Sequence, residues 1–234
     1  DFDAVAITAG AMDAVALDVP GGDLEGVDYG VDFMKKANLG QDIDPGRDVV
    51  VIGGGYTAMD CSRTSLRHGA EHVSIVYRRT RSELVVDEEE LGETEREGVR
   101  MEFLASPVEV LGKGGKVTGV KFIRNKLGEP DASGRRSPIP IEGSEFVIPA
   151  QTVIPAVSQA ADLTFLPIES SFEINRGRLR VDPATYASNV RGVFACGDFV
   201  TGPTTLIEAA GHGKKCAYAI DRYLAGRTDV SVAA

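Results

Sequence analysis

A glycine-rich turn between an apolar strand and a helix restricts most strongly what this chain can fold into. Residues 48–52 (DVVVI) form a β-branched apolar run, which predicts a buried parallel strand. The run leads directly into residues 53–55 (GGG), and a helical pattern follows over residues 57–68. Residues 72–77 (HVSIVY) predict a second strand. Together these segments form a βαβ unit of about 30 residues, which is the size that such a unit needs.

The turn also carries the spacing of a dinucleotide-binding fingerprint, Gly53-x-Gly55-x-x-Ala58. The first glycine permits a tight turn, the second lets a pyrophosphate approach the backbone, and the small third residue lets helix and strand pack closely. The start of the helix offers free N–H groups and the positive end of its dipole to the anion. A glycine-rich turn that serves packing alone is the alternative. We predict that the binding residues are Gly53, Gly54, Gly55, Tyr56, Thr57 and Ala58.

The end of the second strand indicates which nucleotide binds. A site for NAD usually places Asp or Glu about 20 residues after the glycine turn, where it holds the ribose 2′-hydroxyl. This chain has Arg78 and Arg79 there instead, with no acid. A carboxylate would repel a 2′-phosphate, whereas guanidinium groups pair with it. We therefore predict NADPH, bound by Arg78 and Arg79 and assisted by Arg81; two surface arginines without a ligand are the alternative.

A second cluster of candidate ligands lies near the C-terminal end of the sequence. Gly197 and Asp198 follow the apolar run 193–196, and residues 202–205 (GPTT) then begin a helical pattern that extends to Leu224. A carboxylate at the end of a parallel strand can accept a hydrogen bond from a sugar-alcohol hydroxyl. A helix start can direct its N–H groups at the electron-rich O2 edge of a flavin. The residues alone leave open whether Asp198 is only a helix-capping or turn residue.

Three segments, residues 53–61, 77–79 and 192–198, resemble the small (beta) subunit of NADPH-dependent glutamate synthase and related FAD/NADPH oxidoreductases. The resemblance spans nearly the whole chain. It implies an α/β fold like that of thioredoxin reductase, with a Rossmann-like NAD(P)-binding domain inserted into a partial Rossmann-like FAD-binding domain. Strand-like pieces between residues 99 and 148, one of them over residues 116–124, predict a β-meander beside the parallel sheet of the inserted domain.

The resemblance also implies domain boundaries and site residues. Residues 1–44 would belong to the FAD-binding domain and the crossing, residues 45–159 to the NADPH-binding domain, and residues 160–234 to the C-terminal part of the FAD-binding domain. Asp198 would contact the flavin ribityl chain, and Ser158 stands where relatives usually have glycine on the nicotinamide side. Backbone contacts to the isoalloxazine ring would come from Thr204, Thr205 and Leu206.

The FAD-binding GxGxxG segment and the cysteine-rich iron–sulfur region of the family lie upstream of residues 3–9 and are not in this sequence. We therefore expect iron–sulfur clusters only in that upstream region, and we expect the chain alone to be colourless and inactive. In the whole protein, the resemblance implies hydride transfer from NADPH to FAD. Electrons would then pass through iron–sulfur centres to a partner like the large subunit of glutamate synthase.

The cofactors carry this chemistry, so no catalytic acid or base is required and none is assigned. A non-catalytic NADP(H)-binding module within a larger assembly is the alternative. Two other enzyme classes are excluded by the residues. A disulfide reductase needs a redox pair, but none of Cys61, Cys196 and Cys216 has a second cysteine three residues on. A short-chain dehydrogenase needs Tyr-x-x-x-Lys, which does not occur here.

Composition excludes further partners. The net charge of −10 argues against nucleic acid, whose phosphates demand a basic surface. The sequence has no apolar run of about 18 residues, so we expect no membrane span. Its histidines and cysteines have no zinc-like spacing, and no metal site is predicted. Three cysteines without a disulfide pattern favour a reducing compartment, and we expect the cytoplasm.

Overall fold

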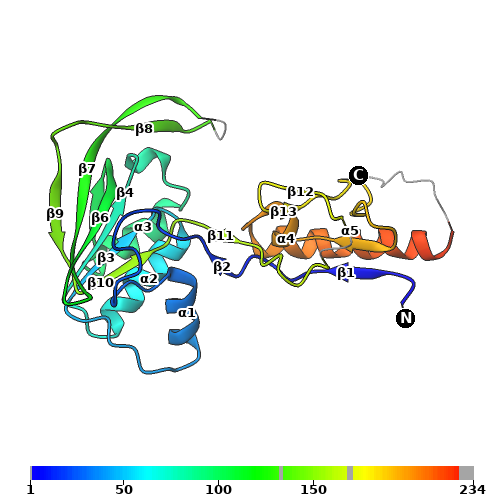
Figure 1. The fold of residues 1–234 in the computed structure, drawn as a ribbon, viewed down its shortest axis with the longest axis horizontal. Helices are drawn as coiled ribbons and strands as arrows, with labels where there is room; N and C mark the ends of the chain where they lie inside the picture. The colour runs from blue at the N-terminus through cyan, green and yellow to red at the C-terminus, as the bar shows by residue number, and fades with distance from the viewer. Residues whose placement is uncertain (1, 132–133, 168–170, 227–234) are drawn as a thin grey trace. The chain divides into compact units, whose positions relative to one another are not determined.

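The computed structural model describes residues 2–131, 134–167 and 171–226. The chain forms two compact units (Figure 1). The first, which we call the nucleotide unit, consists of residues 16–157. The second, the split unit, combines residues 1–15 with residues 158–234.

The first of these boundaries, at residues 15/16, differs from the boundary expected at 44/45. The reason is that residues 16–44 pack on the nucleotide unit. Helix α1 (Gly30–Asn38) places Phe33, which is 1% exposed, in one core cluster with Val49 and Cys61. Upstream of α1, the Asp28 N–H donates to the carbonyl oxygen of Val153 at 3.0 Å. The second boundary, at 157/158, lies two residues before the expected one.

A four-stranded parallel sheet forms the centre of the nucleotide unit, with its strands in the order β10-β3-β4-β5. Parallel neighbours need crossover connections. Helix α2 (Tyr56–Arg67) connects β3 to β4, and helix α3 (Glu88–Arg96) connects β4 to β5. Valines of the central strand are at most 1% exposed, as the apolar run predicted. The strands are β3 (Asp48–Ile52), β4 (His72–Tyr77), β5 (Arg100–Phe103) and β10 (Thr152–Pro155).

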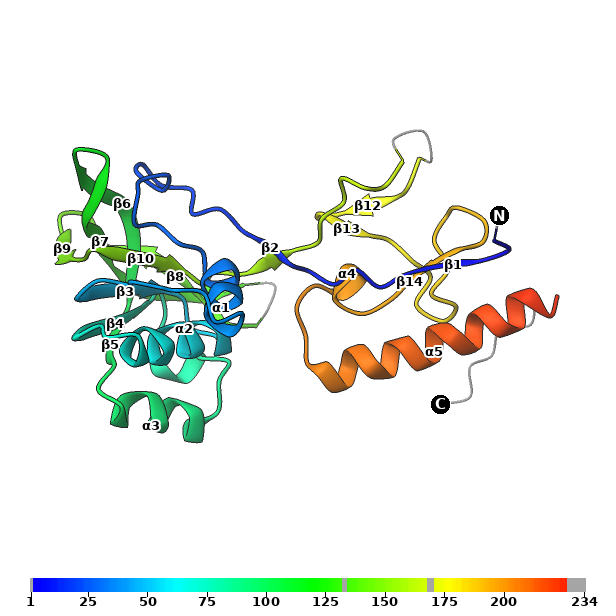
Figure 2. The same ribbon diagram turned by 90° about the horizontal axis from the view of Figure 1, so that it is seen from below.

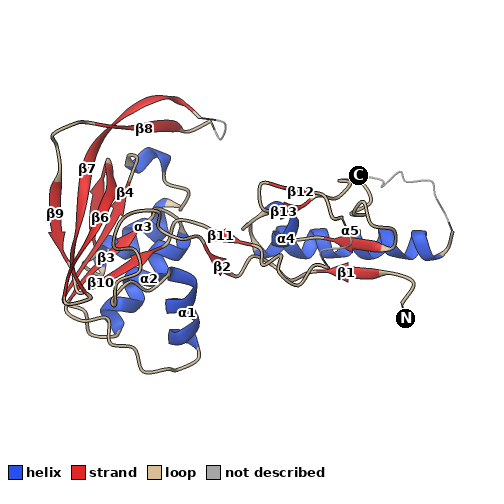
Figure 3. Cartoon of the chain, viewed as in Figure 1, coloured by secondary structure: helices blue, strands red, loops and turns tan. Residues whose placement is uncertain are grey.

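The two faces of this sheet are covered differently, as Figure 3 shows. Helices α1 and α2 pack on one face, through a core that includes Met59 and Ile75. An antiparallel meander covers the other face, and Phe122 of its central strand packs with Ile52 and Val76. The meander consists of β6 (Ala105–Lys113), β7 (Lys116–Pro130), β8 (Arg136–Pro140) and β9 (Phe146–Pro149).

The parallel sheet and the meander agree with the sequence-based expectation, but β7 is longer than expected. The pattern predicted a strand over residues 116–124, whereas β7 continues to Pro130 and pairs with β8. In this antiparallel pairing Pro130 lies opposite Arg136. A bulge interrupts the register between Leu127 and Pro130. The polar sequence of residues 125–130 has little of the alternation by which a half-buried strand is recognised.

The split unit joins segments from the two ends of the sequence. Strand β1 (Val5–Ile7) pairs in parallel with β14 (Val193–Ala195), with Val5 opposite Val193. Figure 2 shows α5 (Leu206–Leu224) running along this pair. The shorter elements of the split unit are β2 (Asp13–Ala14), β11 (Gln159–Ala160), β12 (Ile174–Asn175), β13 (Arg178–Leu179) and α4 (Asp198–Thr201).

Candidate dinucleotide site

The turn between β3 and α2 requires glycine at its first two positions. Gly53 has φ +156°, and a Cβ atom there would overlap the carbonyl oxygen of Ala156. A Cβ atom on Gly54 would overlap the ring of Tyr77. Gly55 differs, because a Cβ atom there would meet only Val85, at 3.8 Å. The turn is therefore tightly packed at Gly53 and Gly54 and open at Gly55, where the sequence predicts that a pyrophosphate approaches the backbone.

The N-terminus of α2 has no side-chain cap. Gly55 is the N-cap residue, and the first turn contains no acidic side chain. The first amides of the helix that bond to its carbonyl oxygen are those of Ala58, at 2.9 Å, and Met59, at 3.3 Å. Those of Tyr56 and Thr57 donate to no described residue. Such amides at the positive end of a 12-residue helix suit an anion.

The remaining fingerprint positions are placed as the motif requires. Ala58 is fully buried in the interface between α2 and the sheet, where a larger side chain would push the two apart. Tyr56 is half exposed, and its hydroxyl donates to Asp87 Oδ2 at 3.0 Å. Since Asp87 also caps α3 by accepting from the Glu90 N–H at 2.8 Å, it connects the first turns of two helices.

Residues 80–87 lie beside the glycine turn. This neighbouring segment was not predicted from the sequence. Leu84 lies next to the position that a Cβ atom on Gly54 would occupy, at 2.9 Å. The segment is held by a capping box in which the Thr80 N–H donates to Glu83 Oε2 at 3.0 Å. The pattern Thr80-x-x-Glu83 is a known sequence signal for this arrangement, so the short helix η1 (Arg81–Glu83) could have been found.

Arg78 and Arg79, which the sequence-based prediction treats alike, have different surroundings in the structure. Arg78 is exposed, and its guanidinium group hydrogen-bonds with no described residue. Arg79 is 2% exposed and donates to Asp131 Oδ2 at 2.6 Å and to the carbonyl oxygen of Arg136 at 2.7 Å. Arg81 pairs with two glutamates of α3. Of the three, Arg78 is the arginine whose charge is available to a 2′-phosphate.

The flavin-side residues are brought together at the start of α5. Gly197 has φ +68° and ψ −156°, a conformation that essentially requires glycine. Asp198, half-buried, accepts from the Thr204 hydroxyl at 2.9 Å and from the Thr204 N–H at 3.2 Å. The Thr205 N–H donates to Glu208 Oε2 at 3.0 Å in a capping box. Of the three predicted backbone contacts, the Leu206 N–H is the one without an acceptor among the described residues.

The cysteines do not form a redox pair. Cys61, Cys196 and Cys216 are free and at most 3% exposed. Burial raises the pKa of the Cys61 thiol to about 12, and burial together with the adjacent Cys196 raises that of Cys216 to about 12. Thiols held protonated in this way are poor nucleophiles. The described residues also contain no group of three or more His, Cys, Asp or Glu side chains that could hold a metal ion.

Residues 1–213 match the family described as pyridine nucleotide-disulphide oxidoreductase. The chain belongs to this family. It is 44% identical over 230 residues to the NADP(+)-dependent formate dehydrogenase subunit beta of Moorella thermoacetica. It is also 36% identical over 244 residues to the glutamate synthase [NADPH] small chain of Azospirillum brasilense. The predicted resemblance to glutamate synthase small subunits is thus confirmed.

These alignments cover 96% and 98% of this chain but only 32% and 50% of the two relatives. Among solved structures, FprA of Mycobacterium tuberculosis in complex with NADPH superposes with a TM-score of 0.74 and 21% identity, covering 99% of this chain and 67% of that one. T. acidophilum thioredoxin reductase gives 0.71 and 23%, covering 95% and 66%. These likenesses confirm the expected thioredoxin-reductase-like fold with two dinucleotide-binding units. No described helix has the length and apolar character that crossing a membrane requires.

Replacing Ser158 by glycine should stabilise the protein. Ser158 has φ +157°, in a region that glycine occupies without the steric cost that a side chain incurs. Relief of that strain should outweigh the added freedom of glycine in the unfolded chain, and should raise the free energy of unfolding by about 1 kcal/mol. Denaturant unfolding measures the change. Ser137→Gly in strand β8, where φ is negative, is the control and should lower stability instead.

Proposed function

We propose that this chain is the NADPH-binding and flavin-side part of an NADPH-dependent flavoprotein oxidoreductase that supplies electrons to a larger enzyme. The observation that carries the proposal is the open glycine turn at the start of α2, together with Arg78 after the neighbouring strand, whose guanidinium group has no hydrogen-bond partner among the described residues. Turn and arginine fit the two anionic parts of NADPH, its pyrophosphate and its 2′-phosphate. The names of the formate dehydrogenase and glutamate synthase relatives both include this nucleotide, as NADP(+) or NADPH.

The residues of the chain bind and orient the cofactors. Residues 53–58 would hold the pyrophosphate, Arg78 the 2′-phosphate, and Asp198 with the Leu206 N–H the ribityl and ring ends of FAD. When both are bound, NADPH supplies a hydride and the flavin accepts it. No side chain has to donate or remove a proton in that step. We therefore assign no catalytic residue, and the role of Ser158 remains a proposed contact on the nicotinamide side.

We propose further that the electrons leave through iron–sulfur centres to a partner subunit, as in a glutamate synthase small subunit. The names of the relatives differ in what is finally reduced or oxidised: glutamate synthase, formate dehydrogenase and, in Geobacter sulfurreducens, NADPH-Fe(3+) oxidoreductase. What they share with this chain is the NADPH-linked part. The partner, rather than this chain, would therefore determine the final acceptor.

The test compares this chain with a protein extended to the length of the relatives. The extended protein should hold FAD and should reduce an artificial dye with NADPH faster than with NADH. This chain alone should bind NADP+ yet purify colourless, because the flavin-side contacts alone do not offset the entropy lost when a large cofactor is fixed. An extended protein that binds NADP+ but never reduces dye would contradict the oxidoreductase proposal and support a non-catalytic binding module.

In the extended protein, Asp198→Ala should weaken FAD binding about tenfold, since a hydrogen bond to a charged group is lost. NADP+ affinity should not change, because Asp198 belongs to the split unit. Asp162→Ala is a matched control. Asp162 also accepts from a threonine, through the Thr164 hydroxyl at 2.6 Å and N–H at 2.8 Å, but outside the predicted flavin residues. Equal FAD affinity in the Asp198→Ala and unmodified proteins would rule out the ribityl contact.

A further inference from the structure

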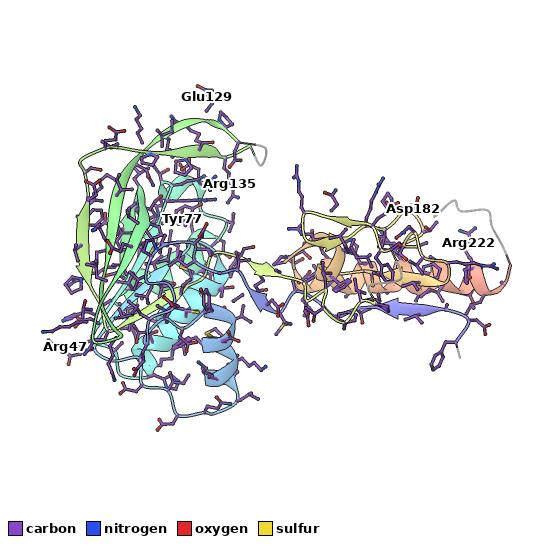
Figure 4. All side chains as sticks on the ribbon, in the orientation of Figure 1. Arg47, Tyr77, Glu129, Arg135, Asp182 and Arg222 are labelled. Atoms are coloured by element: carbon purple, nitrogen blue, oxygen red, sulfur yellow. The ribbon has the colours of Figure 1, made fainter. Side chains whose placement is uncertain are left out.

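The backbone at Arg78 is held by a buried side chain from the meander. Strand β4 ends at Tyr77, which Figure 4 labels, so Arg78 follows the last paired residue of the parallel ladder. The side-chain nitrogen of Asn125 in β7, Nδ2, donates to the carbonyl oxygen of Arg78 at 3.0 Å. Asn125 is 3% exposed and lies 47 residues further along the chain. The position of the Arg78 backbone therefore depends on a contact that is distant in sequence.

This contact requires a side chain that can donate. The carbonyl oxygen of Arg78 only accepts hydrogen bonds, so the group facing it must be the Asn125 nitrogen rather than its oxygen. The same nitrogen also donates to Ser106 Oγ at 2.8 Å. The buried oxygen Oδ1 of Asn125 has no partner among the described residues. An unsatisfied buried acceptor costs about 1–3 kcal/mol, so packing alone would favour an apolar side chain at this position.

The main chain of Asn125 is hydrogen-bonded to the same region. Its N–H donates to the carbonyl oxygen of Leu104 at 2.7 Å, and the Leu104 N–H donates to the carbonyl oxygen of Arg79 at 3.0 Å. Leu104, between β5 and β6, has φ +56°, a strained conformation that persists where the surroundings hold it. The carbonyl groups of Arg78 and Arg79 are thus both held, the first by Asn125 and the second by Leu104. These bonds fix the backbone that carries the exposed Arg78 side chain.

We infer that Asn125 is a positioning residue for Arg78, and that by holding the Arg78 carbonyl oxygen it directs the guanidinium group at the 2′-phosphate of NADPH. The inference rests on the proposed function, because it requires Arg78 to bind that phosphate. Asn125 itself does not contact the nucleotide, since its side chain is buried and its two N–H donors are occupied. A guanidinium group placed in advance loses less freedom when the phosphate binds, which increases affinity.

Calorimetric titration with NADP+ and NAD+ tests the inference, because these nucleotides differ only in the 2′-phosphate. Asn125→Ala should weaken NADP+ binding about fivefold, as expected when a neutral hydrogen bond is lost and the arginine is kept. NAD+ binding should change little. Ser106→Ala is the matched control, since it removes the other bond of the same nitrogen and leaves the bond to Arg78. It should keep the full preference for NADP+.

A double-mutant cycle with Arg78→Gln separates positioning from a general structural role. If Asn125 acts through Arg78, Asn125→Ala should have little further effect on NADP+ binding in the Arg78→Gln background. An equal loss in both backgrounds would overturn the positioning role, and so would an equal loss of NADP+ and NAD+ binding. If Asn125→Ala does not fold, Asn125→Leu fills a similar volume without any donor and takes its place in the cycle.

The outcomes distinguish this inference from the proposed function. Suppose that the unmodified chain prefers NADP+, that Arg78→Gln removes the preference and that Asn125→Ala keeps it unchanged. The inference about Asn125 is then overturned, while the NADPH proposal stands. If the unmodified chain binds NADP+ and NAD+ equally, the NADPH proposal itself fails, and the inference fails with it.

Discussion

Replacing Gly53 by alanine should abolish nucleotide binding and should lower the free energy of unfolding of the nucleotide unit by about 2–6 kcal/mol. Two costs combine at this position. The backbone has φ +156°, where a side chain is strained by roughly 1–3 kcal/mol. The new methyl group would also overlap the carbonyl oxygen of Ala156, and overpacking of this kind costs about 1–3 kcal/mol. Denaturant unfolding and titration with NADP+ measure the two effects.

Gly69→Ala is the control that separates these costs. Gly69, which follows α2, also has a positive φ of +98°, but a Cβ atom there would meet no atom within 4 Å. The substitution should therefore lower stability by about 1 kcal/mol through backbone strain alone, and nucleotide binding should persist. If Gly53→Ala and Gly69→Ala change stability and nucleotide binding equally, the contact with Ala156 does not constrain the turn. Tight packing would then not be the reason that position 53 needs glycine.

The glycine turn could be predicted because its determinants are local. The apolar run of β3, the three glycines and the helix that follows are continuous in sequence, and each constrains the next. Buried parallel strands have nearly continuous apolar sequences, so burial of residues 49–51 could be inferred from composition alone. The same locality explains why the second strand, residues 72–77, was placed with its correct bounds.

The environment of Arg79 could not be predicted from such local patterns. Its carboxylate partner, Asp131, lies 52 residues further along the chain, and the two meet only because β7 continues to Pro130. Arg78 and Arg79 also lie beyond Tyr77, the last residue of β4, so the alternation of side chains along a strand does not show which of the two is buried.

The compact nucleotide unit begins at residue 16 rather than at the expected residue 45 for a similar reason. Residues 16–44 have breaks and a short helical pattern, but nothing in them specifies which sheet they pack against. The deciding contacts are distant in sequence: Val27 forms a bridge with Val153, and Cys61 Sγ donates to the carbonyl oxygen of Gly30 at 3.6 Å. On the flavin side, the start of α5 at Leu206 follows from the capping box of Thr205 and Glu208, a local signal that was present in the sequence.

Replacing Arg78 by glutamine should weaken NADP+ binding about tenfold or more while NAD+ binding changes little. Arg78 is exposed and, among the described residues, its guanidinium group has no hydrogen-bond partner, so its charge remains available to the 2′-phosphate. Losing one charge-assisted hydrogen bond accounts for a change of this size. Arg67→Gln is the matched control. It removes an equal charge from the last turn of α2, where Arg67 pairs with Glu97 at 2.8 Å, and it should leave both affinities unchanged.

The pH dependence of binding provides an independent check on the same contact. A phosphate monoester loses its second proton near pH 6, so its negative charge falls as the pH is lowered through that value. The arginine keeps its charge over this range. The preference for NADP+ over NAD+ should therefore be full above about pH 7 and decrease below about pH 6, and Arg78→Gln should flatten that dependence. A preference that is the same at pH 5 and pH 8 would mean that the 2′-phosphate is not what the site recognises.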